Sequence, residues 1–165
     1  MSQSANQLSA SDRVILDETR HVFGDVDRGS GVTLHETEVI DMYGSADARE
    51  QARRKDTDHH WWEVRDEWID QFGGVGGLSF LDEAGFRYYL PAYMSYWIRT
   101  GEEPNSLAFH LRSNDRLDLD GIFTPAEKKL IARFLDYVCQ RFEDEAARET
   151  LDGFWRRYLD APDGT

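Results

Sequence analysis

Apolar side chains recur at steps of three and four residues along much of this 165-residue chain. That spacing gathers them on one face of an α-helix. The pattern is clearest over residues 124–142. There Thr124 is placed to cap a helix, Pro125 suits its first turn, and Glu127 completes a capping box. The apolar face of this segment consists of Ile131, Phe134, Leu135, Val138 and Phe142. The pattern predicts a long helix that buries one side.

The same signals predict four more helices elsewhere in the chain. The first runs from Ser9 or Ser11 to Gly24, and the second begins at Thr33, with Glu36 as its capping-box partner. The other two cover residues 61–72 and 144–159. In the second of these, Tyr43 is expected to face the core.

Two segments have a weaker helical pattern. Residues 45–60 are so highly charged that either a solvated helix or a mobile connector fits them. Residues 107–112 alternate enough to form a short strand, but a single strand cannot make a sheet. The sequence therefore predicts an all-α fold with at most one short strand-like segment. We expect one compact domain of about five to seven helices over residues 11–160, with flexible ends at residues 1–10 and 161–165.

The segment FLDEAGFRYYLPAYMSYWI, residues 80–98, is the most aromatic part of the chain, yet Arg87 and Pro91 lie in its middle. Asp82 can cap a helix at its start. Proline donates no backbone hydrogen bond and its ring crowds the carbonyl four residues earlier, here that of Arg87. We therefore expect two short helices with a kink or step between them.

Two interpretations of Arg87 stay open. A guanidinium among aromatic rings needs a partner, so Asp82, Glu83 or a distant acid could pair with it and tie helices together. Alternatively, the polar lip of an anion-binding pocket would consist of Arg87, Tyr88, Tyr89 and Tyr93. His110, a titratable group on an apolar stretch, is either a hydrogen-bonded core residue or a proton-transfer group of such a pocket.

Metal and cofactor chemistry have little support in the sequence. His59 and His60 precede Glu63 by four and three residues, so either pair could face one ion on a helix. The further ligands of a recognised signature are missing, and an exposed polar helix start explains the three residues equally well. We predict no cofactor and no metal site.

The net charge of −13, from 32 acidic and 19 basic residues, limits the class of partner. It disfavours nucleic acids and anionic membrane surfaces, both of which attract basic proteins. A basic protein partner fits better. The longest uncharged runs fall well short of the roughly 20 apolar residues of a membrane span, and the start of the chain has no secretory pattern. These features indicate a cytoplasmic protein.

Three stretches carry a resemblance to a known family: SFLDEAGFRYYLPAYM, LAFHL and IFTPAEKKLIARFLDYV. Over about residues 60–140 the chain resembles domain of unknown function 6714, a family of small, mostly bacterial proteins. The resemblance implies a shared helical fold. It implies no activity, cofactor or catalytic residue.

Two functional hypotheses follow. The first is a non-enzymatic protein-interaction module, of the immunity- or inhibitor-protein kind, because the chain is acidic, is rich in aromatic residues and lacks a complete catalytic constellation. The second is a small-ligand-binding protein or enzyme with a pocket around FRYYLPAYM. The sequence does not indicate the partner or ligand, or the oligomeric state.

Overall fold

The computed structural model describes residues 7–162, and over that range the chain is helical without a strand. The α-helices are α1 (Ala10–Val22), α2 (Leu34–Asp41), α3 (Ala46–Arg53), α4 (Asp66–Gln71), α5 (Glu83–Thr100), α6 (Leu107–His110), α7 (Leu119–Ile122), α8 (Pro125–Phe142) and α9 (Glu145–Gly153). The 3₁₀ turns are η1 (Trp61–Glu63), η2 (Gly77–Phe80) and η3 (Trp155–Tyr158). The all-α prediction is confirmed, although the described residues form nine α-helices rather than five to seven.

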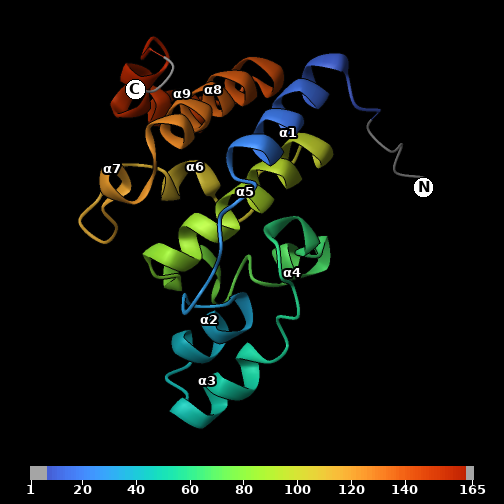
Figure 1. The fold of residues 1–165 in the computed structure, drawn as a ribbon, viewed down its shortest axis with the longest axis vertical. Coiled ribbons are helices and arrows are strands. Elements are labelled where there is room, and N and C mark those ends of the chain that lie inside the picture. The colour runs from blue at the N-terminus through green and yellow to red at the C-terminus, as the bar shows by residue number, and fades with distance from the viewer. Residues whose placement is uncertain (1–6, 163–165) are drawn as a thin grey trace.

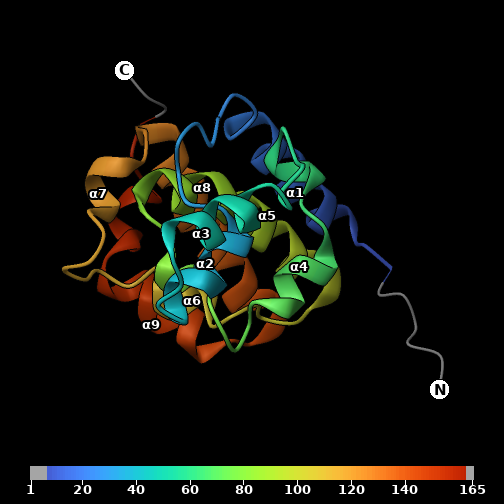
Figure 2. The same ribbon diagram turned by 90° about the horizontal axis from the view of Figure 1, so that it is seen from below.

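Helix α5 forms the centre of the molecule, and Figures 1 and 2 both place it between the other elements. Helix α1 packs on one part of it and on α8, and α9 and η3 lie along α8. Helix α8 contacts α5 through side chains, as in the pair Trp97 and Phe134, whose ring centroids are 5.8 Å apart. Helices α2 and α3 pack against each other at the opposite end (Figure 1). The fully buried side chains of α5 include Phe86, Tyr88, Tyr89, Leu90, Tyr93, Met94, Trp97 and Ile98. One hydrophobic core therefore runs the length of the domain.

The capping predictions are confirmed. In α1, α2 and α8 the side chains of Ser9, Thr33 and Thr124 each accept a backbone N–H, and an acidic side chain three residues later returns to the cap. Asp82 caps α5 by accepting the N–H of Gly85. These bonds satisfy donors that a helix start leaves without partners. The predicted flexible ends lie mostly outside the described residues.

The predicted division into two short helices at Pro91 is wrong, because α5 continues through it as one helix of 18 residues. The φ angle of proline is compatible with a helix, so the interruption costs mainly one hydrogen bond and some crowding. Pro91 is itself buried, and Ser95 Oγ donates to its carbonyl oxygen at 2.7 Å. Burial of the aromatic side chains on both sides of Pro91 outweighs the local preference.

The helix predicted over residues 61–72 is also wrong as a single element. Val64 and Arg65 are extended and separate η1 from α4. This break brings Trp61 into the core, where its indole N–H donates to the carbonyl of Phe23 at 3.0 Å. Tertiary burial again overrides the local pattern.

Three other segments differ from their predictions. Residues 107–112 form the turn of α6, not a strand, since Leu111 N–H bonds to the carbonyl of Leu107. The charged segment 45–60 is helical in α3, and a connector follows. The helix predicted over 144–159 divides into α9 and η3. Within the described range, none of these helices has the length and apolar character needed to cross a membrane.

Candidate functional site

Arg87 of the central motif is engaged by Glu127 at the start of α8. Arg87 Nε lies 3.0 Å from Glu127 Oε2, and Arg87 Nη2 lies 2.7 Å from Oε1. The Glu127 side chain is 3% exposed and that of Arg87 is 36% exposed. The two hydrogen bonds raise the pKa of Arg87. The same carboxylate accepts the N–H of Thr124, so one residue caps α8 and joins it to α5.

Tyr88 and Tyr89 belong to a different, buried polar cluster. Tyr88 OH donates to Asp58 Oδ2 at 2.6 Å, and Arg28 Nη1 lies 2.8 Å from the same oxygen. Tyr89 OH accepts from Arg28 Nη1 at 3.1 Å and from the N–H of Leu34 at 3.3 Å. Burial raises the pKa of both tyrosines, with the nearby carboxylates adding to the effect, so both hydroxyls stay protonated.

Next to this cluster lies a second buried carboxylate. Asp56 accepts from the backbone N–H of His35 at 3.1 Å and faces His35 Nδ1 at 2.8 Å. Asp56 and Asp58 both come from the connector after α3, and both side chains are fully buried. The connector is therefore held into the domain by two carboxylates. These contacts were not predicted, because partners 21 and 30 residues apart in the chain leave no local signal in the sequence.

Tyr93 is buried in the core, and its hydroxyl has no hydrogen-bond partner among the described residues. Burial alone raises its pKa. The four residues of the predicted pocket lip thus lie in three separate places. Arg87 pairs with Glu127, Tyr88 and Tyr89 belong to the buried polar cluster, and Tyr93 lies in the core. None of the four lines either of the two surface cavities described below.

His110, at the end of α6, lines a cavity of about 490 Å³ that does not include Arg87. The other lining residues are Ser79, Phe109, Arg112, Ser113, Asn114, Asp115 and Arg116. Burial, together with the nearby charge of Arg116, lowers the pKa of His110 to about 4. The imidazole is therefore neutral at pH 7. The structure does not bring the two candidate polar groups of the sequence analysis, Arg87 and His110, into one pocket.

The weak metal candidates form a local cap. Glu63 Oε2 accepts the backbone N–H groups of His59 at 2.6 Å and His60 at 2.9 Å. The ring of His60 stacks on Trp62, with the ring centroids 4.3 Å apart. Over residues 7–162, no cluster of three or more histidine, cysteine or acidic side chains is arranged to hold a metal ion.

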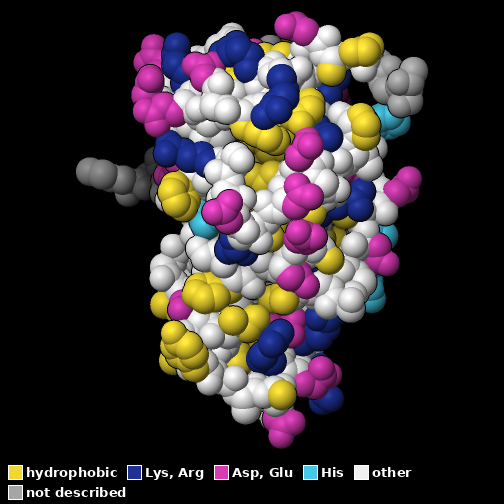
Figure 3. All heavy atoms as spheres, turned by 90° about the vertical axis from the view of Figure 1, so that its left-hand side faces the viewer, with side chains coloured by type: hydrophobic (Ala, Val, Ile, Leu, Met, Phe, Trp, Pro, Cys, Tyr) yellow, Lys and Arg dark blue, Asp and Glu magenta, His cyan; other side chains and the backbone are white. Residues whose placement is uncertain are grey.

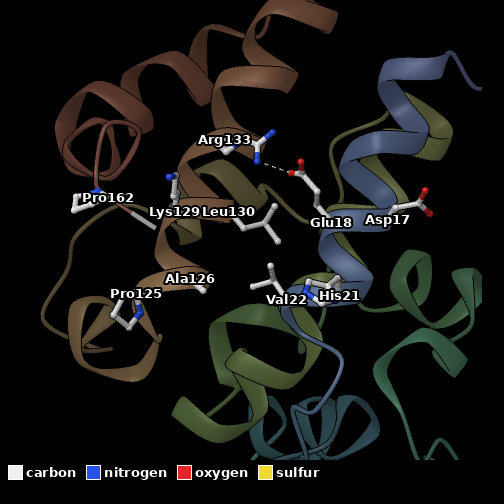
Figure 4. Close-up of a pocket in the computed structure, with 10 residues that line it drawn as sticks. All are labelled: Asp17, Glu18, His21, Val22, Pro125, Ala126, Lys129, Leu130, Arg133 and Pro162. Carbon is white, nitrogen blue, oxygen red and sulfur yellow. Dashed lines mark ion pairs between the residues drawn. The ribbon is translucent and has the colours of Figure 1, made fainter. Parts of the chain in front are cut away.

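A groove of about 460 Å³ lies between α1 and α8 (Figure 4). Val22 and Leu130 point into it from the two helices. Arg133 and Glu18 close one side with an ion pair of 2.8 Å. Lys129 donates to the carbonyl of Ala161 at 3.0 Å. Of the charged groups that border this groove, Glu18 and Arg133 thus pair with each other, and Lys129 contacts the backbone.

The turn between α2 and α3 is the most exposed apolar feature among the described residues. Tyr43 is 96% exposed and Met42 is 68% exposed. The prediction that Tyr43 faces the core is therefore wrong. Its backbone is left-handed, with φ of 56°, and this turns the side chain away from α2. Figure 3 shows hydrophobic side chains gathered at the lower end of the molecule, where α2 and α3 lie in Figure 1.

These features define an acidic, all-α domain whose central motif is engaged in internal contacts. The chain belongs to the family described as "Family of unknown function (DUF6714)", which it matches over residues 12–159. The match extends the resemblance of residues 60–140 to the N-terminal helices. Neither the curated proteins nor the solved structures contain a significant match.

Proposed function

We propose that the protein is a non-enzymatic interaction module that binds a basic protein partner through the turn between α2 and α3. The observation that carries this proposal is Tyr43, an aromatic side chain almost fully exposed on a left-handed backbone. A left-handed conformation costs a non-glycine residue about 1–2 kcal/mol. Strain of this kind tends to be kept at functional positions.

The turn is also rigid. The N–H of Gly44 donates to the carbonyl of Val39 at 2.8 Å, and the N–H of Tyr43 donates to the carbonyl of Ile40 at 3.1 Å. From the neighbouring loop, the N–H of Gly76 bonds to Asp41 Oδ2 at 2.9 Å. Because the backbone is already fixed, only the side-chain torsions of Tyr43 have to be ordered on binding, and tyrosine is one of the residues enriched among interface anchors.

Charge favours a basic partner. Both arginines of α3 are paired with one acidic side chain, since Arg53 Nη1 lies 3.0 Å and Arg49 Nη2 lies 3.7 Å from Glu36. Asp47 is exposed at the start of α3, and the whole chain carries a net charge of −13. A partner with a basic surface would be attracted over a distance of about 10 Å at ordinary ionic strength.

The alternative of a ligand pocket or active site around FRYYLPAYM receives less support. Such a site needs polar groups that face a cavity. In this motif, Arg87 bonds to Glu127 and Tyr88 bonds to Asp58. The polar groups of the motif thus serve mainly to join helices.

Site-specific photocrosslinking tests the interaction proposal. A benzophenone side chain at position 43 is expected to crosslink a basic protein in lysate, and one at Val14, exposed on α1, is the control. With the purified partner, Tyr43→Ser should weaken binding by about tenfold or more, in the range of an interface hot spot. Identical products from positions 43 and 14, or unchanged affinity of Tyr43→Ser, would refute the proposal.

A further inference from the structure

The cavity beside α6 has the features of a binding site that the interaction proposal does not use. Loop residues 112–116 line it together with the end of α6 and Ser79 of η2. Its volume of about 490 Å³ falls within the range of small-ligand sites. Phe109 is 62% exposed, so its ring offers an apolar surface at the rim.

Arg116 has unused hydrogen-bonding capacity in this cavity. Its Nη1 donates to the carbonyl of Leu81 at 2.7 Å and its Nη2 to that of Leu78 at 3.1 Å. A guanidinium has five N–H donors, so three remain. No carboxylate within residues 7–162 forms an ion pair with it, and burial lowers its pKa. Arg112, by contrast, is neutralised by Glu149 at 2.8 Å.

The loop holds Arg116 in place. Asn114 Oδ1 accepts the backbone N–H groups of Arg116 at 2.8 Å and Leu117 at 3.1 Å. Asn114 Nδ2 donates to the carbonyl of Arg112 at 2.8 Å. These bonds, with the two carbonyls that the guanidinium contacts, fix the cation without neutralising it. A preorganised cation of this kind suits a planar anion that can accept two parallel hydrogen bonds.

We propose that this cavity binds a small aromatic monocarboxylate, with its carboxylate on Arg116 and its ring against Phe109. His110 would lie beside the ligand as a neutral hydrogen-bonding group. Asp115 also lines the cavity, so a second negative group on the ligand is disfavoured by repulsion. The ligand therefore carries one carboxylate and an otherwise apolar body.

Calorimetric titration with indole-3-acetate tests the proposal, and indole-3-acetamide serves as a matched neutral probe. We expect the acetate to bind at least about tenfold more tightly, because charge-assisted bonds to arginine are stronger than neutral ones. Amide resonances of Phe109, Ser113 and Arg116 should shift on titration. Absence of binding, equal affinity of the two probes, or shifts elsewhere would overturn the proposal.

Three variants test whether the carboxylate of the ligand binds at Arg116. Arg116→Gln should lower the affinity about tenfold or more. Arg13→Gln, which removes an exposed arginine of α1, should leave it unchanged. Because Arg116 also donates to the carbonyls of Leu78 and Leu81, a second variant separates loss of binding from loss of folding. Ser113→Glu keeps those contacts and places a carboxylate in the cavity, so it should also weaken binding. Equal effects of Arg13→Gln and Arg116→Gln, or no effect of Ser113→Glu, would contradict the assignment.

Discussion

The pair of Arg87 and Glu127 gives the sharpest test of how the central helix is joined to the rest of the domain. Arg87→Met keeps most of the apolar stem but removes both hydrogen bonds to Glu127, at 3.0 and 2.7 Å. The carboxylate of Glu127, 3% exposed, is then left without its cation. It retains the N–H of Thr124 as a partner.

The expected loss follows from the exposure of the two side chains. Breaking a buried ion pair costs about 3–5 kcal/mol, whereas exposed pairs contribute about 0–1 kcal/mol. Because Arg87 is 36% exposed, solvent screens the interaction in part. We expect Arg87→Met to lower the free energy of unfolding by about 2 kcal/mol. This corresponds to a fall in Tm of about 4–8 °C for a chain of this size.

Urea denaturation followed by circular dichroism measures the effect, and α5 provides its own control. Arg99 makes two bonds of 2.8 Å to Asp66, but these side chains are 39% and 42% exposed. Arg99→Met should therefore cost less than about 1 kcal/mol. Adding Glu127→Gln to Arg87→Met should recover stability, since the carboxylate is then neutral. The reasoning fails if Arg87→Met loses no more than Arg99→Met, or if the double variant is no more stable than Arg87→Met.

Three further predictions address other parts of the domain. Tyr43→Gly should raise the free energy of unfolding, measured by urea denaturation, by about 1 kcal/mol. Glycine adopts φ of 56° without strain, and the exposed tyrosine ring packs on nothing that would be lost. A glycine variant no more stable than Tyr43→Ala would contradict this. Tyr88→Phe removes a hydrogen-bond donor from the fully buried carboxylate of Asp58, so it should lower the free energy of unfolding by about 1–3 kcal/mol in the same assay. A decrease below about 0.5 kcal/mol, the size of a neutral surface change, would count against this. Below pH 6.5 the unfolded chain takes up a proton at His110 that the folded protein, with its pKa of about 4, does not bind, so stability should fall as the pH drops from 6.5 towards 4. His110→Gln should flatten that decline, and parallel curves for the two proteins would show that the histidine does not cause it.

The sequence predicted the local features well where neighbouring residues carry the information. The caps at Ser9, Thr33 and Thr124 are such features, because each one depends on a side chain three residues away. The predictions failed where distant packing decided the outcome. Pro91 was expected to break α5, and residues 61–72 were expected to form one helix.

The candidate site was predictable only in its parts. The two interpretations of Arg87 could not be separated from the sequence, because Glu127 lies 40 residues away. Arg28, Asp58 and Asp56 gave no signal, since a charged connector looks the same whether it faces solvent or is buried. Arg116 was missed for a related reason, namely that its partners are backbone carbonyls, which every residue has.

The sequence by itself determined the helical class, the capped helix starts at Ser9, Thr33 and Thr124, and the acidic character, because periodicity, capping and charge depend on residue type and short spacing. Tertiary structure alone decided which charges are paired, which tyrosines are buried and which one is exposed. Those outcomes depend on the positions of groups far apart in the chain. Long-range burial and electrostatics choose among conformations that local interactions leave nearly equal in free energy.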